Sequence, residues 1–341
     1  MSRPIEPAEL ADETRLGRLL STLEDDPLAS GELLAALPSP PAPAAGLGYQ
    51  RVGVTGAPGV GKSTLLRRLI AAYRAAGHRV GVVAVDPTSP LTGGAILGDR
   101  LRLAPDELDS GVFIRSLGSR GSLGGITPGA SAVAAVLEAA GYDRILIETV
   151  GVGQTGYDVI CLADTVVALF SPEGGDGLQM LKAGMLEVGD IIAVNKSDRP
   201  ESDAMLMEIR LSLELATPGA AELAHHGLPA EQTAAQVPAG TTADWRPPVI
   251  RLAAKLGEGV DEVLKGVERH RQWLAALPEQ HPRRRQRAAR ELAFVLRSRL
   301  SRLLEAGLAG RIDALAARVQ AGELALWQAA EQLRADVREL L

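Results

Sequence analysis

The sequence is poor in cysteine, in aromatic residues and in lysine. Cys161 is the single cysteine among 341 residues, which excludes an intrachain disulfide scaffold and any metal site built from several cysteines of one chain. Aromatic residues make up only 3% of the chain, so aliphatic side chains must form most of the hydrophobic core. Lysines are five of the 36 basic residues, so each one merits attention: Lys62, Lys182, Lys196, Lys255 and Lys265.

The chain also lacks an excess of positive charge and a long apolar run. Its formal net charge is −6, which argues against a general nucleic-acid-binding protein. No uncharged apolar run approaches the roughly 18 residues that a membrane-spanning helix requires. Residues 1–23 hold four acidic side chains and no apolar segment of the kind found in signal peptides. We therefore expect a cytoplasmic protein that binds neither nucleic acid nor a membrane.

Three zones follow one another along the chain. Residues 1–44 combine leucines at helical spacing with a proline-rich stretch, which predicts a helical extension and a linker. Residues 45–277 alternate apolar runs with helical stretches, a pattern typical of an α/β fold with a mostly parallel sheet flanked by helices. The runs expected to form strands are 51–55, 80–85, 112–115, 144–148, 165–170, 191–195 and 248–252.

The last zone, residues 278–341, predicts a helical extension at the C-terminus. An Arg-rich amphipathic helix is expected over 283–306, followed by helices over 308–320 and 322–340. The leucine face of the first helix fits either packing against the main domain or pairing with a second subunit. The residues alone leave both possibilities open.

A glycine-rich phosphate-binding motif follows the first apolar run. Residues 56–63 match G-x-x-x-x-G-K-[ST], and together with the next residue they give nine candidate nucleotide-binding residues: Gly56, Ala57, Pro58, Gly59, Val60, Gly61, Lys62, Ser63 and Thr64. Glycines let backbone N–H groups turn toward phosphate oxygens, and the dipole of the following helix favours the negative charge. Lys62 brings a positive charge to the β- and γ-phosphates, and the Ser63 hydroxyl can ligate Mg²⁺. The motif in this context predicts a P-loop NTPase.

Acidic residues stand where two later strands are predicted to end. Asp86 follows the run 80–85, and Glu148 ends the run 144–148 before a glycine-rich segment. Ligands of open α/β sheets bind beyond the carboxyl ends of the strands, so both carboxylates should face the phosphates and their Mg²⁺. Asp99, in another glycine-rich stretch, is a third candidate ligand.

A second motif indicates which base is bound. Asn195-Lys196-Ser197-Asp198 matches N-K-x-D at the end of a predicted strand. An aspartate carboxylate accepts hydrogen bonds from N1–H and the exocyclic amine of guanine, a pair that adenine does not offer there. Asn195 would fix the loop, and the stem of Lys196 would cover the ring face. A backbone N–H at Ala254 is a further candidate for reading the guanine oxygen.

With these motifs the sequence resembles the MeaB/ArgK-type GTPases, chaperones of adenosylcobalamin-dependent methylmalonyl-CoA mutase. The resemblance covers roughly residues 45–270 and rests on GAPGVGKST at 56–64, VDPTSPLTGGAILGDRLRL at 85–103, ETVGVGQ at 148–154 and NKSD at 195–198. It implies that Lys62 and Ser63 hold phosphate and Mg²⁺, and that Asp86, Asp99 and Glu148 surround the ion. It also implies a homodimer formed largely by the C-terminal helices.

The family has a further mobile loop that signals to the mutase, and residues 171–182 match it. Glycines and acidic residues between a predicted strand and a helix fit a switch that senses the nucleotide, with Asp176, Gln179 and Lys182 as its candidate residues. The sequence departs from the family pattern in two places. The segment 216–247 is longer and less regular than the family's usual link, and Ala253 stands where the guanine loop usually has serine.

These observations lead to the hypothesis of a GTPase that binds GTP or GDP with Mg²⁺. It would hydrolyse GTP slowly alone and faster with a partner, with Lys62, Glu148 and Gln154 as candidate catalytic residues and Gln154 positioning the attacking water. The resemblance implies that its client is methylmalonyl-CoA mutase or a closely related acyl-CoA mutase, with the adenosyltransferase as a candidate second partner. Its task would be to gate cofactor loading and to protect or reactivate the mutase.

Three other functions share parts of the pattern. A metallochaperone-type GTPase of hydrogenase or urease maturation usually carries Cys or His ligands, whereas here Cys161 lies in an apolar stretch and His225-His226 in a predicted loop. A targeting GTPase of the signal-recognition type should carry a Met-rich helical domain, and the chain has five methionines. A nucleotide-dependent kinase would transfer the phosphoryl group to an acceptor rather than to water.

Overall fold

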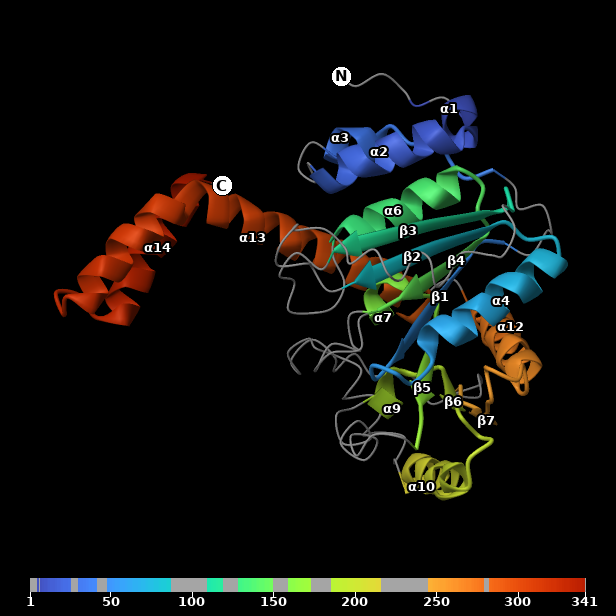
Figure 1. The fold of residues 1–341 in the computed structure, drawn as a ribbon. Helices are drawn as coiled ribbons and strands as arrows, with labels where there is room; N and C mark the ends of the chain where they lie inside the picture. Colours follow the sequence, from blue (N-terminus) through green and yellow to red (C-terminus); the bar gives the residue numbers. More distant parts are fainter. Residues whose placement is uncertain are drawn as a thin grey trace. The chain divides into compact units, whose positions relative to one another are not determined.

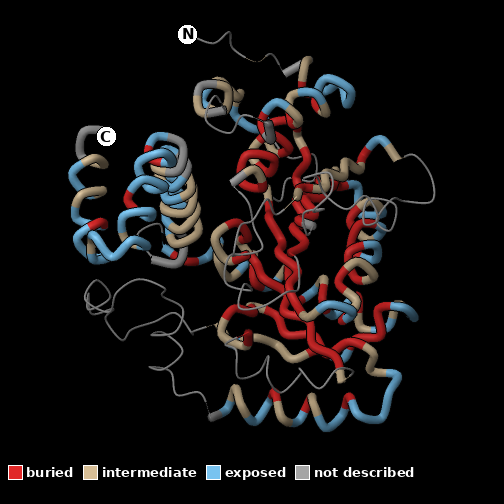
Figure 2. Tube along the Cα trace, turned by 60° about the vertical axis from the view of Figure 1, so that its left-hand side comes forward, coloured by how far each residue is buried: buried red, intermediate tan, exposed pale blue. Residues whose placement is uncertain are grey.

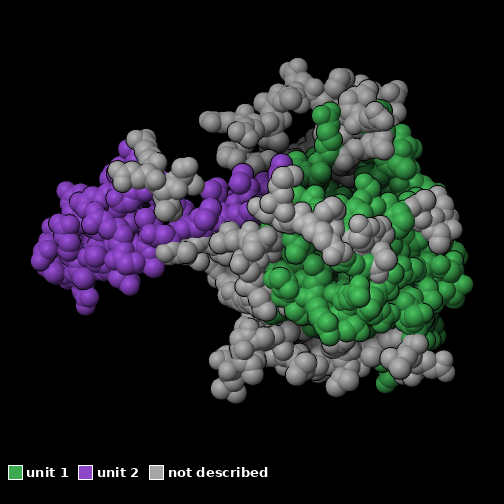
Figure 3. Space-filling model, turned by 90° about the horizontal axis from the view of Figure 1, so that it is seen from above, with its two compact units in different colours: residues 1–291 green, residues 292–341 purple. Residues whose placement is uncertain are grey.

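The computed structural model describes most of the chain. The described residues are 5, 7–25, 30–41, 48–86, 109–118, 128–149, 159–172, 185–215, 245–278 and 282–340. They belong to two compact units, residues 1–291 and residues 292–341, which Figure 3 colours separately. Within these ranges no helix combines the length and the apolar character that a membrane crossing requires.

A parallel sheet forms the centre of the first unit (Figure 1). Its described strands are β1 (Gln50–Gly56), β2 (Val80–Asp86), β3 (Val112–Gly118), β4 (Arg144–Glu148), β5 (Thr165–Phe170), β6 (Ile191–Val194) and β7 (Val249–Arg251). The strand order is β3-β2-β4-β1-β5-β6-β7, and all neighbouring pairs are parallel. β1 is therefore the strand at which the order reverses. The predicted α/β fold with a P-loop NTPase arrangement is confirmed, and each predicted apolar run forms a strand.

Helices cover both faces of this sheet. α4 (Lys62–Ala75) and α12 (Val260–Ala276) pack on one face, where α4 contacts β1, β2 and β4 and α12 contacts β5 and β6. The other face is covered by α6 (Pro128–Ala139), α7 (Val159–Leu162), α9 (Met185–Val188) and α10 (Glu201–Leu215). Both faces of each central strand are thus withdrawn from water, which explains why the strand sequences are continuously apolar rather than alternating. Figure 2 shows this burial along the central strands.

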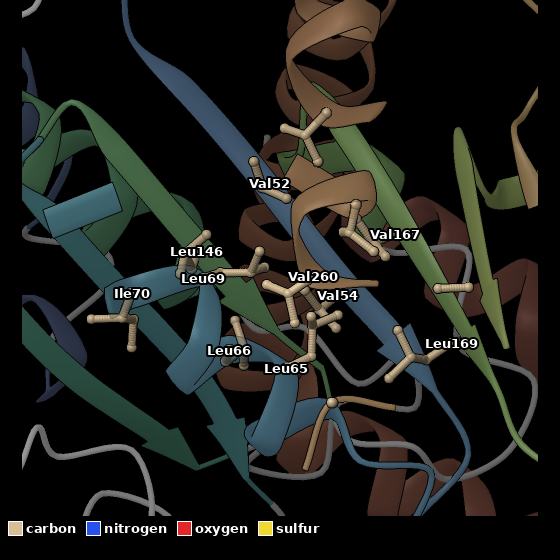
Figure 4. Close-up of a cluster of buried hydrophobic side chains, with 14 of the residues drawn as sticks. Val52, Val54, Leu65, Leu66, Leu69, Ile70, Leu146, Val167, Leu169 and Val260 are labelled. Atoms are coloured by element: carbon tan, nitrogen blue, oxygen red, sulfur yellow. The ribbon is translucent and has the colours of Figure 1, made fainter. Parts of the chain in front are cut away.

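The larger part of the core lies between the sheet and the α4–α12 face (Figure 4). Val54, Leu66 and Leu169 are fully buried in this cluster of aliphatic side chains. On the opposite face a glycine makes room for α7, because a Cβ added to Gly53 would lie 2.3 Å from a methyl carbon of Val159. The close approach of α7 to β1 holds the start of that helix beside the strand that leads to the P-loop.

Three short helices precede the sheet, as the leucine spacing predicts. They are α1 (Pro7–Ala11), α2 (Glu13–Asp25) and α3 (Ser30–Ala35). Leu16, Leu20 and Leu23 recur on one side of α2 and are buried, and α2 contacts α6 of the main fold. The apolar stripe of α2 therefore serves packing.

The C-terminal helices differ from the prediction in one respect. α13 (Pro282–Gln320) is one helix of 39 residues, whereas separate helices were expected over 283–306 and 308–320. Glycine costs a helix interior only about 1 kcal/mol relative to alanine, so Gly307 and Gly310 do not end it. α14 (Leu326–Leu340) follows, and Arg311 of α13 pairs with Asp336 of α14 at 2.9 Å.

Candidate functional site

The candidate site lies at the carboxyl edge of the sheet, where the parallel strands end. The loops that follow β1, β4, β6 and β7 leave the sheet at this edge, on the two sides of the central strand β1. In an open parallel sheet this is the place where ligands bind, because the loops and the N-termini of the following helices converge there. The phosphate-binding motif follows β1, Glu148 ends β4, the N-K-x-D tetrad follows β6, and Ala254 lies in the loop after β7.

The P-loop connects β1 to α4 through glycines in the left-handed region. Gly59 has φ 74°, and Gly61, the N-cap of α4, has φ 100°. A Cβ added to Gly61 would lie 2.2 Å from the side-chain nitrogen of Asn195, so a glycine is required there by both conformation and space. The loop therefore turns its backbone tightly onto the N-terminus of α4, where N–H groups and the helix dipole favour an anion.

Lys62 is held inside this loop. Its ammonium group donates to the carbonyl oxygen of Gly56 at 2.9 Å and to that of Ala57 at 3.0 Å, and the residue is only 8% exposed. A buried ammonium group needs such partners, because desolvation of a charge is costly. The contacts place a positive charge within the curve of the P-loop, as the motif predicts. The half-buried Ser63 and Thr64 follow it in the first turn of α4.

Ser63 in the first turn of α4 meets Glu148 at the end of β4. The Ser63 hydroxyl donates to Oε1 of Glu148 at 2.9 Å, and Glu148 is 7% exposed at the end of β4. Beside them Thr149 donates its hydroxyl hydrogen to the Thr55 hydroxyl at 3.2 Å. A hydroxyl and a carboxylate at hydrogen-bond distance form a set of hard oxygen donors, which fits Mg²⁺.

Asn195 joins the P-loop to the loop that follows β7. Its side-chain N–H donates to the Val60 carbonyl at 2.7 Å, and its side-chain oxygen accepts from the Ala254 N–H at 3.0 Å. The residue is buried, and Lys196 directly after it has φ 61°, a conformation that non-glycine residues rarely adopt. Asp198 is exposed at the end of the tetrad. One amide side chain thus fixes three segments far apart in the sequence.

Arg68 is a residue of this site that the sequence did not indicate. It lies on α4, and its guanidinium donates to the carbonyl oxygens of Ala254 at 3.2 Å and Lys255 at 2.8 Å. No motif covers it, because an arginine on an exposed helix face is the ordinary pattern of a soluble protein. Only the three-dimensional approach of α4 to the loop after β7 reveals the contact.

Several predicted site residues cannot be placed in this geometry. Asp86 is the last residue of β2 and pairs with Gly118 of β3, but its side chain is not among those described. The other predicted residues lie outside the described residues: Asp99, Gln154, Asp176, Gln179 and Lys182. Their roles stay predictions.

A parallel sheet with a phosphate loop after its central strand β1 and an N-K-x-D tetrad after β6 defines a P-loop nucleotide-binding protein of the GTPase class. The family model described as methylmalonyl Co-A mutase-associated GTPase MeaB matches residues 17–308 of the chain. The chain belongs to this family, as the resemblance of its motifs implied.

Individual relatives agree with this assignment. The chain is 36% identical over 334 residues to a putative GTPase of Pyrococcus abyssi, covering 98% of this chain and 95% of that protein. It is 38% identical over 213 residues to the mouse methylmalonic aciduria type A homolog, mitochondrial, covering 62% of this chain and 47% of that protein. A solved structure described as LAO/AO transport system kinase superposes with a TM-score of 0.64 at 22% identity, covering 97% of this chain and 95% of that one, and shows the same fold.

Proposed function

We propose that this protein binds GTP with Mg²⁺ and hydrolyses it to GDP and phosphate, as a chaperone of an adenosylcobalamin-dependent acyl-CoA mutase. The observation that carries the proposal is the convergence of Lys62, the Ser63–Glu148 pair and Asn195 at one edge of the sheet. These residues belong to the P-loop and α4, to the end of β4 and to the N-K-x-D tetrad. The residues proposed to bind the phosphates, the metal ion and the base therefore lie at the same edge of the sheet.

Hydrolysis at such a site depends on positioning and on charge stabilisation. Lys62 and the N–H groups of the P-loop bind the β- and γ-phosphates and stabilise the charge that develops on them. Ser63 and Glu148 hold Mg²⁺, with Asp86 and Asp99 proposed to complete the set of oxygen ligands. When bound, the ion neutralises charge on the phosphate oxygens. Gln154 is proposed to position the attacking water.

The base is proposed to lie against the N-K-x-D segment. Asp198 accepts from N1–H and the exocyclic amine of guanine, and the Lys196 stem covers the ring. Asn195 fixes the position of the P-loop relative to the loop after β7, because its side chain forms hydrogen bonds with both Val60 and Ala254. The recognition of guanine and the binding of phosphate are thereby supported by one side chain.

The partner is inferred from the family, whose description names a mutase-associated GTPase. We propose that residues 171–182, with Asp176, Gln179 and Lys182, report the state of the nucleotide to the mutase and that turnover is slow without it. The adenosyltransferase is the proposed second partner.

Residues 278–341 are proposed to form the homodimer, since Leu326 and Trp327 of α14 expose apolar side chains. Residues 1–44 and 45–277 are the proposed N-terminal extension and GTPase domain, and the proposed location is the cytoplasm.

The deciding experiment measures GTP turnover by the purified protein with and without purified adenosylcobalamin-dependent acyl-CoA mutases. We expect a low basal rate that a cognate mutase raises, and a complex detectable by size-exclusion chromatography. A protein that hydrolyses GTP but neither binds nor responds to any of these mutases would refute the chaperone role. Transfer of the labelled γ-phosphate to an acceptor instead of to water would refute the hydrolase role.

A further inference from the structure

Arg68 links the P-loop helix to the loop that follows β7. Its Nε donates to the Ala254 carbonyl oxygen and its Nη2 to the Lys255 carbonyl oxygen, at 3.2 Å and 2.8 Å. A guanidinium presents its donors in one rigid plane, so it can hold two successive carbonyls at once. The loop on the receiving side, residues 253–259, is named here the β7 loop.

The β7 loop is otherwise stabilised by its own backbone and by Asn195. The N–H groups of Leu256 and Gly257 both donate to the Ala253 carbonyl, at 2.9 Å and 3.0 Å. The Ala254 N–H, which the sequence suggested as the reader of the guanine oxygen, donates to the Asn195 side chain at 3.0 Å. The amide that the motif alone would assign to the base is therefore engaged within the protein.

The next backbone amide along the chain, that of Lys255, differs from the Ala254 amide in its hydrogen bonding. Within the described part of the chain, the Lys255 N–H donates to no group. It belongs to the same planar trans peptide as the Ala254 carbonyl, and in such a peptide the C=O and the N–H point in opposite directions. Because Arg68 holds this carbonyl, it also fixes the direction of the Lys255 N–H, which points away from Arg68.

The β7 loop lies beside the N-K-x-D segment. Asn195 contacts it at Ala254, and the Ser197 N–H donates to the Leu252 carbonyl at 3.1 Å just before it. On guanine the oxygen at position 6 is adjacent to the N1–H that an N-K-x-D aspartate recognises. A donor from a segment next to the tetrad is therefore required to satisfy this oxygen, and adenine, with an amino group there, would oppose such a donor.

We propose that Arg68 is a positioning residue for guanine recognition, which orients the Ala254–Lys255 peptide so that the Lys255 N–H binds the oxygen at position 6 of the base. The proposal rests on the proposed function, since it assumes that a guanine nucleotide occupies this site. It assigns to a surface arginine of the P-loop helix a role in base specificity rather than in phosphate binding. In the proposed role Arg68 acts through this peptide rather than by contacting the base or the phosphates.

The test compares the binding of GDP and of 6-thioguanosine diphosphate, measured by calorimetry in the presence of Mg²⁺. The thio analogue keeps N1–H and the exocyclic amine but replaces the oxygen by sulfur, a weak acceptor. For Arg68→Ala we expect GDP affinity to fall about tenfold while affinity for the thio analogue changes little, so that the preference for GDP nearly disappears. Arg68→Lys should recover part of the preference, since an ammonium group can still donate to one carbonyl.

Arg67→Ala is the matched control, because Arg67 is the exposed neighbour on the same helix. It should retain the affinity of the wild type for both nucleotides. Equal weakening of both nucleotides by Arg68→Ala, or no weakening at all, would overturn the positioning role. If instead the wild-type protein binds GDP no more tightly than ADP, the proposed function itself fails, and the two failures are thus distinguished.

Discussion

The two edges of the central sheet are built in different ways. At the amino edge, where the parallel strands begin, buried or half-buried polar side chains hold the elements together: Arg51, His78, Asp143, Arg144, Asp164 and Asp190. At the carboxyl edge, left-handed glycines and backbone carbonyls do so among the described residues, and Lys62, Glu148 and Asn195 there are the candidates for the chemistry. The comparison leads to the prediction that the amino edge mainly supplies stability and the carboxyl edge supplies the proposed function.

Three aspartates at the amino edge have the same structural role. Asp143, Asp164 and Asp190 each directly precede a strand, and each side chain accepts a backbone N–H in a neighbouring strand or directly before it. The acceptor distances are 3.0 Å to the N–H of Arg79, 2.9 Å to that of Arg51 and 2.9 Å to that of Val166. These carboxylates satisfy buried backbone donors. Acidic residues before strands are therefore structural here, whereas those at strand ends are candidates for metal binding.

Arg51 is paired with two carboxylates at the amino edge. Its guanidinium holds Glu138 of α6 through two hydrogen bonds of 2.7 Å and Glu291 of α13 through one of 2.8 Å. Arg287, one turn before Glu291, binds Asp164 at 2.6 Å. Burial raises the pKa of Asp164, although both arginines favour its charged form. The first turns of α13 are thereby fastened to the start of β1.

The largest effect is expected from Arg51→Ala. It leaves the carboxylates of Glu138 and Glu291 without their shared cation, so the free energy of unfolding should fall by about 3–5 kcal/mol. Chemical denaturation measures the loss. A variant that combines Arg51→Met with Glu138→Gln and Glu291→Gln should lose much less, because no buried charge is left unpaired. A loss below about 1 kcal/mol for Arg51→Ala would show that the amino edge does not depend on this network.

Lys62→Ala tests the carboxyl edge and should affect GTP turnover without a comparable effect on stability. Removal of the ammonium group from the P-loop should lower GTP turnover by about a hundredfold or more, since charge stabilisation is the main contribution at such sites. The free energy of unfolding should change little by comparison. Steady-state phosphate release gives the rate, and Lys265→Ala on the exposed face of α12 is the control. Unchanged turnover would refute the assignment of the site.

Asn195→Ala should lower both nucleotide affinity and stability, each by a smaller amount. The variant loses the bonds to the Val60 carbonyl and the Ala254 N–H, so GDP affinity should fall about tenfold. The free energy of unfolding should fall by about 1 kcal/mol. Asp190→Ala at the amino edge is the matched variant, and it should reduce stability without reducing affinity. If the two variants behave alike, the separation between the edges does not hold.

The sequence predicts the fold better than it predicts the polar contacts of the site. Continuous apolar runs identify each strand that the structure describes because both sheet faces are covered, and the P-loop is recognisable because its glycines are required by conformation. By contrast, Arg68 was missed, and the bond from Asn195 to the Ala254 N–H could not be foreseen. Both contacts join segments that meet only after the sheet has formed, and neither leaves a pattern in the local sequence. The aspartates before the strands do leave one, since each directly precedes an apolar run.

The smallest effect is expected from Asp109→Asn, which tests whether the weaker ion pairs of the amino edge also contribute. Arg74 binds both oxygens of Asp109, at 2.7 Å and 2.9 Å, and this hydrogen bonding, with the Gly111 N–H, holds the pKa of Asp109 below its ordinary value of 3.8. The unfolded chain therefore binds a proton more readily than the folded one, so the contribution to stability is present above the ordinary pKa and is lost as the pH falls through the lowered one.

Because the Asp109 side chain is 33% exposed, the contribution should be below about 1 kcal/mol at neutral pH. Asp109→Asn should thus be slightly less stable than the wild type at neutral pH, and the difference should vanish in acid as the wild-type carboxylate becomes protonated. Urea titrations at neutral and acidic pH measure it, with Glu214→Gln on the exposed face of α10 as the control. A difference that persists unchanged in acid would assign the effect to local packing rather than to the charge, and the contribution of charge at this edge would then be confined to its buried network.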